Sequence, residues 1–383
     1  MDKHSRAGID VSKDWVDVER REGTEKVERS RFSNDEAGHR KICRWLREGG
    51  CSTRVVVEAT GTYHRKLVQA LHKSAGIEVM VANPKAVKKF REALLQRAST
   101  DVTSATAIRE FAERMEFKPW SPPAKASTDL QALARRAAAL TDLKIEEKNR
   151  LHAAVTGGEP RAVLASLRKT IKGLGENLEV VRGAAMEVIE GDKKLSQDYR
   201  ALVSIKSIGR VSAIAILAEV SCLPPGMSVR QWVAYAGLDP RPVESGSSVK
   251  RPRRISKMGN QHLRRALFMP ALVAVRCNPV VKAYAEHLEA RGKAKLVIVV
   301  AVMRKLLHAI YGMLKSGTTF EGEKFYRHPQ PSAATAEAKE QPVSGAPAGG
   351  NRPSVARAAR GAQRAGRVKG EIGRKAELGA ANP

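Results

Sequence analysis

The sequence has few aromatic residues and few cysteines. Aromatic side chains make up only 4% of the 383 residues, so a core has to be built mainly from aliphatic side chains. This shortage also argues against a protein that binds single strands by stacking bases on rings. The four cysteines form no C-x-x-C pair and have no histidine at zinc spacing, which predicts free thiols in a reducing compartment.

Long apolar runs are also missing. The stretch Leu296–Met303 is far shorter than the roughly 18 residues that a membrane-spanning helix needs. The N-terminus has no apolar segment behind its charges, so no signal peptide is predicted. We therefore expect a cytoplasmic protein that does not bind membranes.

Acidic residues are too few to balance the basic ones. The chain has 68 Lys and Arg residues against 40 Asp and Glu residues, a formal net charge of +28. A charge of this size points to a polyanionic partner, and nucleic acid is the usual one.

The first part of the chain, residues 1–122, is predicted to be an α/β domain. Short β-branched segments such as "TRVVVEAT" and "IEVMVANP" indicate strands, and "HRKLVQALHKS" and "PKAVKKFREALLQ" have helical spacing. Strands that alternate with helices are typical of a layered α/β fold.

The next part, residues 123–195, is predicted to be a helical hairpin or a coiled-coil arm. Apolar residues there are spaced alternately by three and four positions, as in a heptad seam. These residues are Leu164, Leu167, Ile171, Leu174, Leu178, Val181, Ala185 and Val188. Such an arm joins copies of a protein, or else the helix is buried within its own chain.

Residues 196–326 are predicted to form an α-helical domain. Beyond it, the composition of residues 327–383 shifts to Pro, Ala, Gly, Ser and Arg, with almost nothing to bury. We expect this basic tail to be disordered and to add weak, sequence-independent affinity for phosphates.

Three acidic residues form a candidate metal site. Asp10 and Glu58 end predicted strands, and Asp101 begins a predicted helix. Acids at the ends of neighbouring strands can converge, and their combined charge then favours a cation such as Mg²⁺. On the pattern alone, Asp10 could equally cap a turn and Asp101 a helix.

Several motifs together resemble the DEDD transposases of bacterial insertion sequences, family one-hundred-ten. They include "GIDVSKDWVDV", "VVVEATGTYH", "TDVTSATAIREFA", "AYAGLDPRPVESGSS" and "ISKMGNQHLRRAL", in the family's order across residues 6–315. The resemblance implies an RNase H-like (RuvC-like) N-terminal domain. It also implies a helical C-terminal domain that supplies a catalytic serine.

The resemblance assigns the first three acids of the family name to Asp10, Glu58 and Asp101. Ser104 stands where the family has its fourth acid. A hydroxyl is a weaker, neutral ligand, so the copy is inactive, weakened, or compensated by a nearby acid such as Asp14 or Glu110.

The family's nucleophilic serine falls on Ser245, in the segment "ESGSSVKRPRRISKMGNQHLRRAL". Ser247 and Ser248 are nearby alternatives, and a plain Gly-Ser turn is the alternative without chemistry. The surrounding cations would hold the phosphate and lower the barrier to serine attack. The candidate residues are Lys250, Arg251, Arg253, Arg254, Lys257, Arg264 and Arg265.

Upstream, "SIKSIGRVSAIAILAEV" resembles a helix-hairpin-helix element that binds phosphate through a helix N-terminus. Lys206, Gly209 and Arg210 would make these contacts, although the usual Pro-Gly is Lys-Ser here. An ordinary packing turn is the alternative.

The resemblance implies a transposase that joins its acids and its serine in one composite site, depends on Mg²⁺, and forms a homodimer or homotetramer. Its expected partners are element and target DNA, and a guide RNA encoded by the element. Two alternatives remain, namely a nucleic-acid-binding relic that Ser104 has inactivated and a hydrolytic junction nuclease that does not need Ser245.

Overall fold

The computed structural model describes residues 4–22, 26–48, 52–59, 61–94, 101–241, 244–245, 249–250 and 254–326. The predicted basic tail, residues 327–383, lies outside the described residues.

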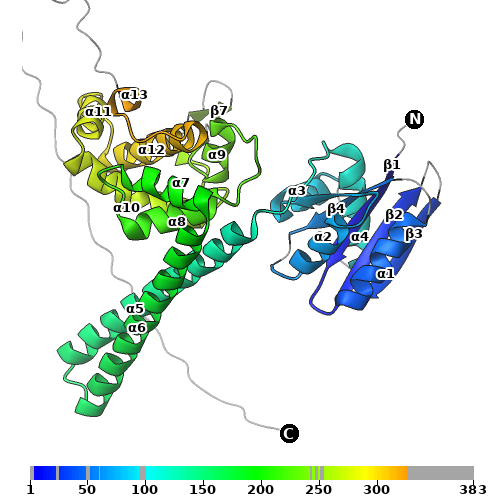
Figure 1. Ribbon diagram of the computed structural model, residues 1–383, viewed down its shortest axis with the longest axis horizontal. Helices are drawn as coiled ribbons and strands as arrows, with labels where there is room; N and C mark the ends of the chain where they lie inside the picture. The colour runs from blue at the N-terminus through cyan, green and yellow to red at the C-terminus, as the bar shows by residue number, and fades with distance from the viewer. Residues whose placement is uncertain are drawn as a thin grey trace, which may run out of the picture. The chain divides into compact units, whose positions relative to one another are not determined.

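The N-terminal part is built on a five-stranded mixed sheet (Figure 1). Its strands, in spatial order β3-β2-β1-β4-β5, are β3 (Lys26–Ser33), β2 (Trp15–Glu22), β1 (His4–Val11), β4 (Ser52–Glu58) and β5 (Ile77–Ala82). β1 pairs antiparallel with β2 and parallel with β4, so the central strand joins a hairpin ribbon to a parallel pair. This arrangement is consistent with the predicted RNase H-like domain.

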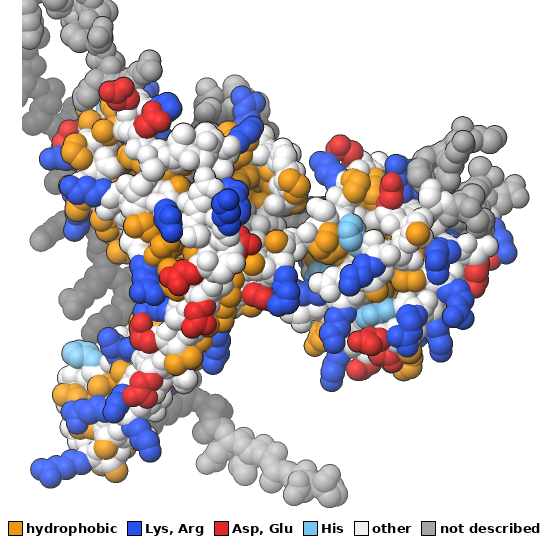
Figure 2. All heavy atoms as spheres, in the orientation of Figure 1, with side chains coloured by type: hydrophobic (Ala, Val, Ile, Leu, Met, Phe, Trp, Pro, Cys, Tyr) orange, Lys and Arg blue, Asp and Glu red, His pale blue; other side chains and the backbone are white. Residues whose placement is uncertain are grey.

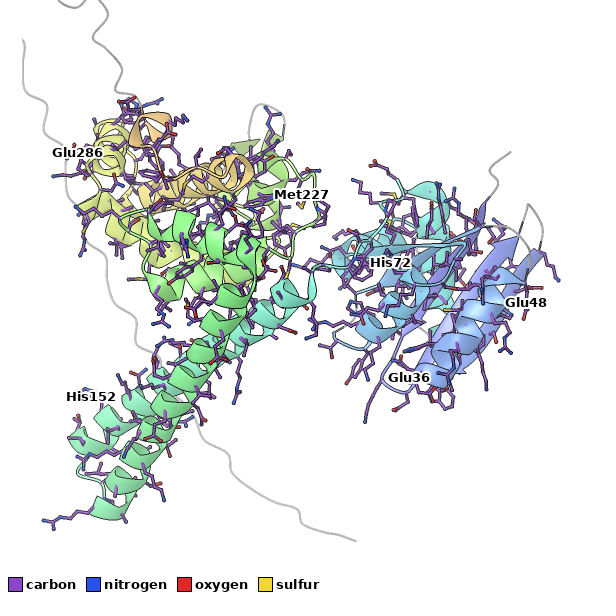
Figure 3. All side chains as sticks on the ribbon, viewed as in Figure 1. Glu36, Glu48, His72, His152, Met227 and Glu286 are labelled. Atoms are coloured by element: carbon purple, nitrogen blue, oxygen red, sulfur yellow. The ribbon has the colours of Figure 1, made fainter. Side chains whose placement is uncertain are left out.

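Helices cover both faces of the sheet. Their bounds are α1 (Glu36–Arg47), α2 (His64–His72), α3 (Pro84–Ala93) and α4 (Asp101–Arg114). Glu36 and Glu48 mark the two ends of α1 (Figure 3). Successive residues of β4 point to opposite faces: Val55 and Val57 pack with α1 and α2, and Val56 packs with α3 and α4.

Helix α4 lies directly against the central strand because Gly8 has no side chain. A Cβ at Gly8 would lie 2.1 Å from the backbone nitrogen of Arg109 and 2.6 Å from the carbonyl oxygen of Ala105. Any other residue at this position would force the helix away from β1.

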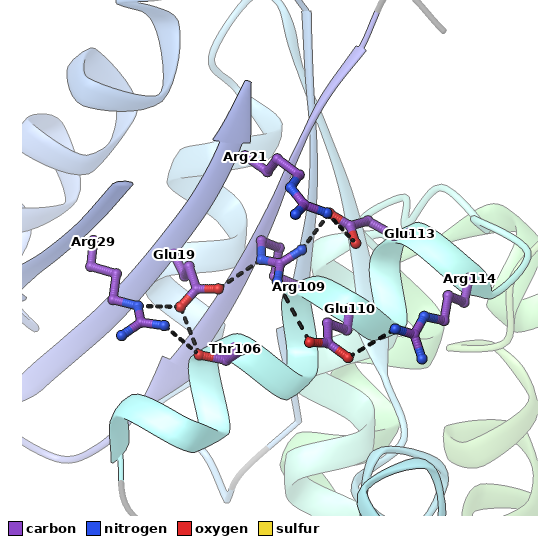
Figure 4. Close-up of polar contacts among 8 residues, drawn as sticks. All are labelled: Glu19, Arg21, Arg29, Thr106, Arg109, Glu110, Glu113 and Arg114. Carbon is purple, nitrogen blue, oxygen red and sulfur yellow. Dashed lines mark hydrogen bonds and ion pairs between the residues drawn. The ribbon is translucent and has the colours of Figure 1, made fainter. Parts of the chain in front are cut away.

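A buried ion pair fixes α4 on the sheet (Figure 4). Arg109 donates to Glu19 Oε1 at 2.7 Å, and Thr106 donates to Glu19 Oε2 at 2.7 Å. The Glu19 side chain is fully buried on β2. Burial opposes its ionisation, but hydrogen bonds from Arg109, Thr106 and Arg29 outweigh burial and lower its pKa.

The middle of the chain forms the predicted helical hairpin. α5 (Lys125–Thr156) and α6 (Arg161–Gly191) pack side by side, and His152 lies near the far end of α5 (Figures 1 and 3). The heptad-spaced residues of α6 are buried or half-buried, with Leu178 and Ala185 almost fully covered. Contact within the chain therefore accounts for part of this apolar seam.

A helical part with its own aliphatic core follows. It contains α7 (Lys193–Val203), α8 (Arg210–Val220), α9 (Val229–Tyr235), α10 (Gln261–Cys277), α11 (Pro279–Ala290), α12 (Lys295–Ser316) and α13 (Gly322–Phe325). This agrees with the predicted helical region, but the sequence did not predict the short strands within it. The Pro-, Gly- and Ser-rich segment after α9 forms short strands, namely β6 (Pro240–Arg241), β7 (Glu244–Ser245), β8 (Val249–Lys250) and β9 (Arg254–Ile255).

Helix α12 is long and apolar enough to cross a membrane by length and composition alone. The sequence prediction considered only the apolar stretch Leu296–Met303 and therefore underestimated the length of this apolar helix. Its buried residues Val302, Leu306, Leu307 and Ile310 belong to the core of the helical part, as in the central helix of a soluble domain.

The buried pair makes a prediction about stability. Arg109→Met would leave Glu19 buried without its main partner, and the free energy of unfolding of the sheet domain should fall by about 3 kcal/mol. The matched control is Arg114→Met on the same helix, where Arg114 is exposed and pairs with Glu110 at 3.3 Å. That variant should change stability by less than about 1 kcal/mol.

Urea denaturation of both variants, followed by circular dichroism, provides the measurement. Equal losses in the two variants would contradict a structural role for the buried pair.

Candidate active site

Asp10 and Glu58 lie side by side at the same edge of the sheet. Ile9 on β1 pairs with Val57 on β4, so the next residues of these parallel strands are neighbours. The pKa of Glu58 is raised, chiefly by burial and then by the negative charge of Asp10, while Arg91 lowers it. The two carboxylates therefore repel each other in a partly desolvated place.

The N-terminal end of α4 is directed toward this edge. Arg21 pairs with Arg6 across the β1–β2 ladder and contacts Glu113, near the end of α4. Glu19, opposite Gly8, contacts Thr106, closer to the helix start. The helix thus runs antiparallel to β1, and its first turn lies toward the Asp10 end of the strand.

Asp101 is the first residue of α4, as predicted, although its side chain lies outside the described residues. Ser104, which the resemblance assigns to the family's fourth acid, is half-buried and accepts a hydrogen bond from Arg91 of α3 at 3.3 Å. A cationic group therefore faces the position where another carboxylate was expected. Of the two suggested compensating acids, Glu110 contacts Arg109 and Arg114, and Asp14 is exposed on the β1–β2 turn.

Among the described residues, no group of three or more Asp, Glu, His or Cys side chains is placed to hold a metal ion. Two of the three predicted ligands, Asp10 and Glu58, are brought together. The raised pKa of Glu58 fits a site that gains from a bound cation, since a cation would relieve the repulsion that disfavours its ionised form.

Ser245 lies on a small hairpin in the helical part. It pairs with Val249 across the antiparallel strands β7 and β8, and Glu244 pairs with Lys250. Ser247, Ser248, Arg251 and the other predicted cation, Arg253, lie outside the described residues, as do the side chains of Ser245 and Lys250.

The remaining predicted phosphate ligands differ in their availability. Arg254 and Lys257 are exposed. Arg264 donates to the carbonyl oxygen of Ala236 at 2.8 Å, and Arg265 is ion-paired with Asp142 of α5. The last two side chains therefore already have internal partners. On the face shown in Figure 2, Lys and Arg side chains are spread over the arm and the helical part rather than gathered in one patch.

The predicted helix-hairpin-helix segment is a turn between α7 and α8. Lys206, Gly209 and Arg210 are all exposed, and Gly209 precedes the first residue of α8. A Cβ at Gly209 would meet nothing within 4 Å, so the helix N-terminus is open to an external group.

Sequence reasoning missed the anchor of the basic segment. Glu219 of α8 is almost fully buried and accepts hydrogen bonds from Arg135 of α5 at 2.8 Å and from Asn260 at 2.6 Å. Asn260 also caps α10 through His262 and Leu263. The detectable signal was a single acid inside the apolar run "AIAILAEV", because an isolated buried carboxylate needs partners.

Comparison with known proteins finds family matches in both the N-terminal and the C-terminal part of the chain. Residues 7–160 match a model of IS110-type DEDD transposases, described as a transposase, and residues 199–286 match the transposase model of the IS116/IS110/IS902 family. The chain belongs to the IS110 family of transposases. It is therefore a DNA transposase or recombinase, and the predicted family is confirmed.

Individual relatives of this IS110-family transposase are distant in sequence. The pilin gene-inverting protein of Moraxella bovis is 26% identical over 298 residues, covering 76% of this chain and 89% of that protein. Its Moraxella lacunata counterpart is 25% identical over the same length. A 43.6 kDa protein of insertion element IS110 from Streptomyces coelicolor is 28% identical over 120 residues, 31% of this chain and 29% of that protein.

The raised pKa of Glu58 makes a prediction about stability and pH. A carboxyl whose pKa is higher when folded loses folding free energy as pH rises from its ordinary value of 4.5 through the raised value. Glu58→Gln should therefore be more stable than the wild type at neutral pH without metal. The difference should shrink below pH 4.5.

Thermal denaturation at several pH values, with and without Mg²⁺, checks this. Mg²⁺ should stabilise the wild type more than Glu58→Gln. The control is Glu78→Gln on β5, where Glu78 is exposed and pairs with Arg54 at 2.7 Å. A Glu58→Gln protein that is no more stable at neutral pH would contradict the repulsion argument.

Proposed function

We propose that this transposase cleaves and exchanges the DNA strands of an insertion sequence, with Ser245 as the nucleophile and Asp10, Glu58 and Asp101 as the acidic site. The observation that supports this proposal most directly is the pair of mutually repelling carboxylates, Asp10 and Glu58. They lie at the sheet edge toward which the N-terminus of α4 points. Such a pair is unfavourable for folding and therefore suggests a functional role.

In the proposed step, the Ser245 hydroxyl oxygen attacks the phosphorus of a DNA phosphodiester. A serine–phosphate bond forms and the bond from phosphorus to the leaving sugar oxygen breaks. The serine proton passes to solvent and the leaving oxygen takes up a proton. Because the phosphodiester is retained on serine, a strand hydroxyl can reverse the step and rejoin DNA without an external energy source.

Asp10 and Glu58, with Asp101, would hold Mg²⁺. When bound, the ion would stabilise negative charge developing at the phosphate. The cations of the basic segment would bind the flanking backbone, with Lys250, Arg251, Arg253, Arg254 and Lys257 as the candidates, and Lys206 and Arg210 beside the open N-terminus of α8.

The name of the Moraxella relatives supports a rejoining reaction. Inverting a gene requires strands to be cut and then rejoined, which a covalent serine intermediate permits. The family resemblance further supports a guide RNA as partner and assembly into a dimer or tetramer. The net charge of +28 suits binding of both nucleic acids.

Ser104 favours a second candidate function, a nucleic-acid-binding protein that no longer cuts. Its hydrogen bond from Arg91 places positive charge where a fourth carboxylate would bind the cation. This candidate keeps the basic surfaces and loses the chemistry.

The serine chemistry is tested by covalent trapping. With a nicked substrate of the element's end and Mg²⁺, the wild type should form an adduct that survives a denaturing gel and maps to Ser245. Ser245→Ala should abolish the adduct but bind DNA as well as the wild type, because only a hydroxyl is lost. Ser247→Ala and Ser248→Ala are the matched controls.

The alternatives give different outcomes in the same assay. A hydrolytic nuclease would cut without an adduct, and a binding relic would neither cut nor trap. Ser104→Asp should raise the adduct yield by restoring the missing carboxylate. A lower yield in this variant would contradict the interpretation of Ser104 as a weakened ligand.

The composite site makes a prediction about mixed oligomers. If the acids of one subunit act with the serine of another, co-expressed Glu58→Gln and Ser245→Ala chains should regain activity that neither has alone. In a dimer, half the molecules are mixed and each has one intact site, so about a quarter of wild-type activity is expected.

The control is Ser245→Ala co-expressed with the Glu58→Gln/Ser245→Ala double variant, which should stay inactive. Strand-exchange assays on the purified mixtures provide the measurement. No recovery in mixed dimers would place the acids and the serine that act together in one subunit.

A further inference from the structure

The helical part contains a cavity of about 850 Å³ that the chemistry above does not use. Its walls come from α12, from Tyr284 of α11, from residues 318–321 and α13, and from Pro240, Arg254 and Ile255. The last three residues belong to the β6–β9 pair, at the base of the segment that carries Ser245. One wall of the cavity is therefore formed by the two short strands that flank the proposed catalytic segment.

The wall that α12 contributes combines the apolar residues Val297, Val300 and Met313 with small and basic residues. Ala301, Arg304, Lys305, His308 and Gly312 recur at helical spacing on it. In the part of the chain that the structure describes, no ion pair joins Arg304, Lys305 or His308 to a carboxylate, and the acid in the wall, Glu321, is already paired with Lys324 at 2.8 Å. The cavity is thus lined with positive charge that its own wall does not neutralise.

The surroundings disfavour the protonated forms of Lys305 and His308. Burial lowers the pKa of Lys305. Burial, followed by the charges of Arg304 and Lys305, lowers the pKa of His308. An anionic group bound here would relieve both effects, since an opposite charge favours the protonated form.

Aromatic rings gather at the same place, in a chain that has few of them. Lys305 Nζ lies 4.6 Å from the ring centroid of Tyr284 and 5.3 Å from those of Phe325 and Tyr326. Phe320 packs on Phe325 and also lines the cavity. Rings beside cations are the chemistry that binds a nucleobase and its phosphate.

Gly312 leaves space in the wall. It lies inside α12, where glycine is less favourable than alanine, and a Cβ built on it would meet nothing within 4 Å. No part of the described chain fills this position. A glycine there is understandable if a group from outside approaches the helix closely.

We propose that this cavity binds one unstacked nucleotide of a nucleic-acid strand, with its base near Tyr284 and Phe320 and its phosphate near Arg304 and His308. The inference rests on the proposed function, because it presumes that the neighbouring segment holds a nucleic-acid strand. It adds a binding site for a nucleotide beyond the scissile phosphate.

The test fills the cavity without changing its charge. Gly312→Leu should occupy the space, and Gly312→Ala is the matched control that gives a similar gain in helix stability with little filling. Short single-stranded DNA containing 5-iodo-deoxyuridine is bound and irradiated, and mass spectrometry locates the crosslinks. RNA of the same sequence with 5-iodouridine forms a second arm, and shows which nucleic acid supplies the nucleotide.

In the wild type and in Gly312→Ala, crosslinks are expected at Tyr284 or Phe320. Gly312→Leu should reduce them about fivefold or more, as for the loss of one stacked base, while overall binding through the basic segment persists. Arg304→Gln, at an exposed position, should reduce the same crosslinks without filling the cavity and serves if Gly312→Leu folds poorly.

The outcomes separate the two proposals. Binding with crosslinks only outside the cavity, or crosslinks that Gly312→Leu leaves unchanged, would overturn the nucleotide site and leave the transposase function intact. A wild-type protein that binds neither DNA nor RNA would overturn the proposed function, and this site with it.

Discussion

The buried contact between Glu19 and Arg109 determines where the candidate active site is. Gly8 permits α4 to lie on the central strand, but a close approach alone does not fix how far the helix is shifted along it. The ion pair does, because a buried charge without its partner is strongly disfavoured. The first turn of α4 is thereby held at the edge where Asp10 and Glu58 lie.

The same sheet contains two acids, Glu19 and Glu58, whose surroundings shift the pKa in opposite directions. Glu19 is buried more completely than Glu58, yet hydrogen bonds and charges from Arg109 and Arg29 lower its pKa. In Glu58, burial and then the neighbouring charge of Asp10 outweigh the effect of Arg91, and its pKa is raised. Burial therefore does not distinguish a structural acid from a functional one. The balance of partners differs between the two acids, and at the Asp10–Glu58 pair it is consistent with the proposed cation site.

The sequence predicted the strands that end in Asp10 and Glu58, but only part of the fold around them. β-branched runs revealed β4 and β5, and the acids at strand ends were visible because polar residues interrupt those runs. The strand β3 gave no such signal, since Lys26–Ser33 is a charged edge strand with little to bury. The contacts of Glu19 with α4 join residues about 90 positions apart, and no local pattern encodes a pairing at that separation.

The helical part shows the same limit at Glu219, whose partners come from α5 and from the loop before α10. The spacing of apolar residues predicted helices in this part, but it could not predict which helices contact each other. The short strands β6 to β9 were missed because two-residue strands carry no measurable alternation. No sequence pattern predicted the cavity either, since only the structure shows that Gly312 faces open space.

Ser104 and Arg91 change the charge balance at the acidic edge. Replacing a carboxylate by a hydroxyl removes one negative charge, and Arg91, which donates to that hydroxyl, also lowers the pKa of Glu58. Both changes weaken the attraction for a divalent cation and strengthen that for a phosphate. If the site remains active, protein cations have to contribute more to holding the DNA, and the metal less, than in a site with four acids. The excess of Lys and Arg in this chain is consistent with that distribution.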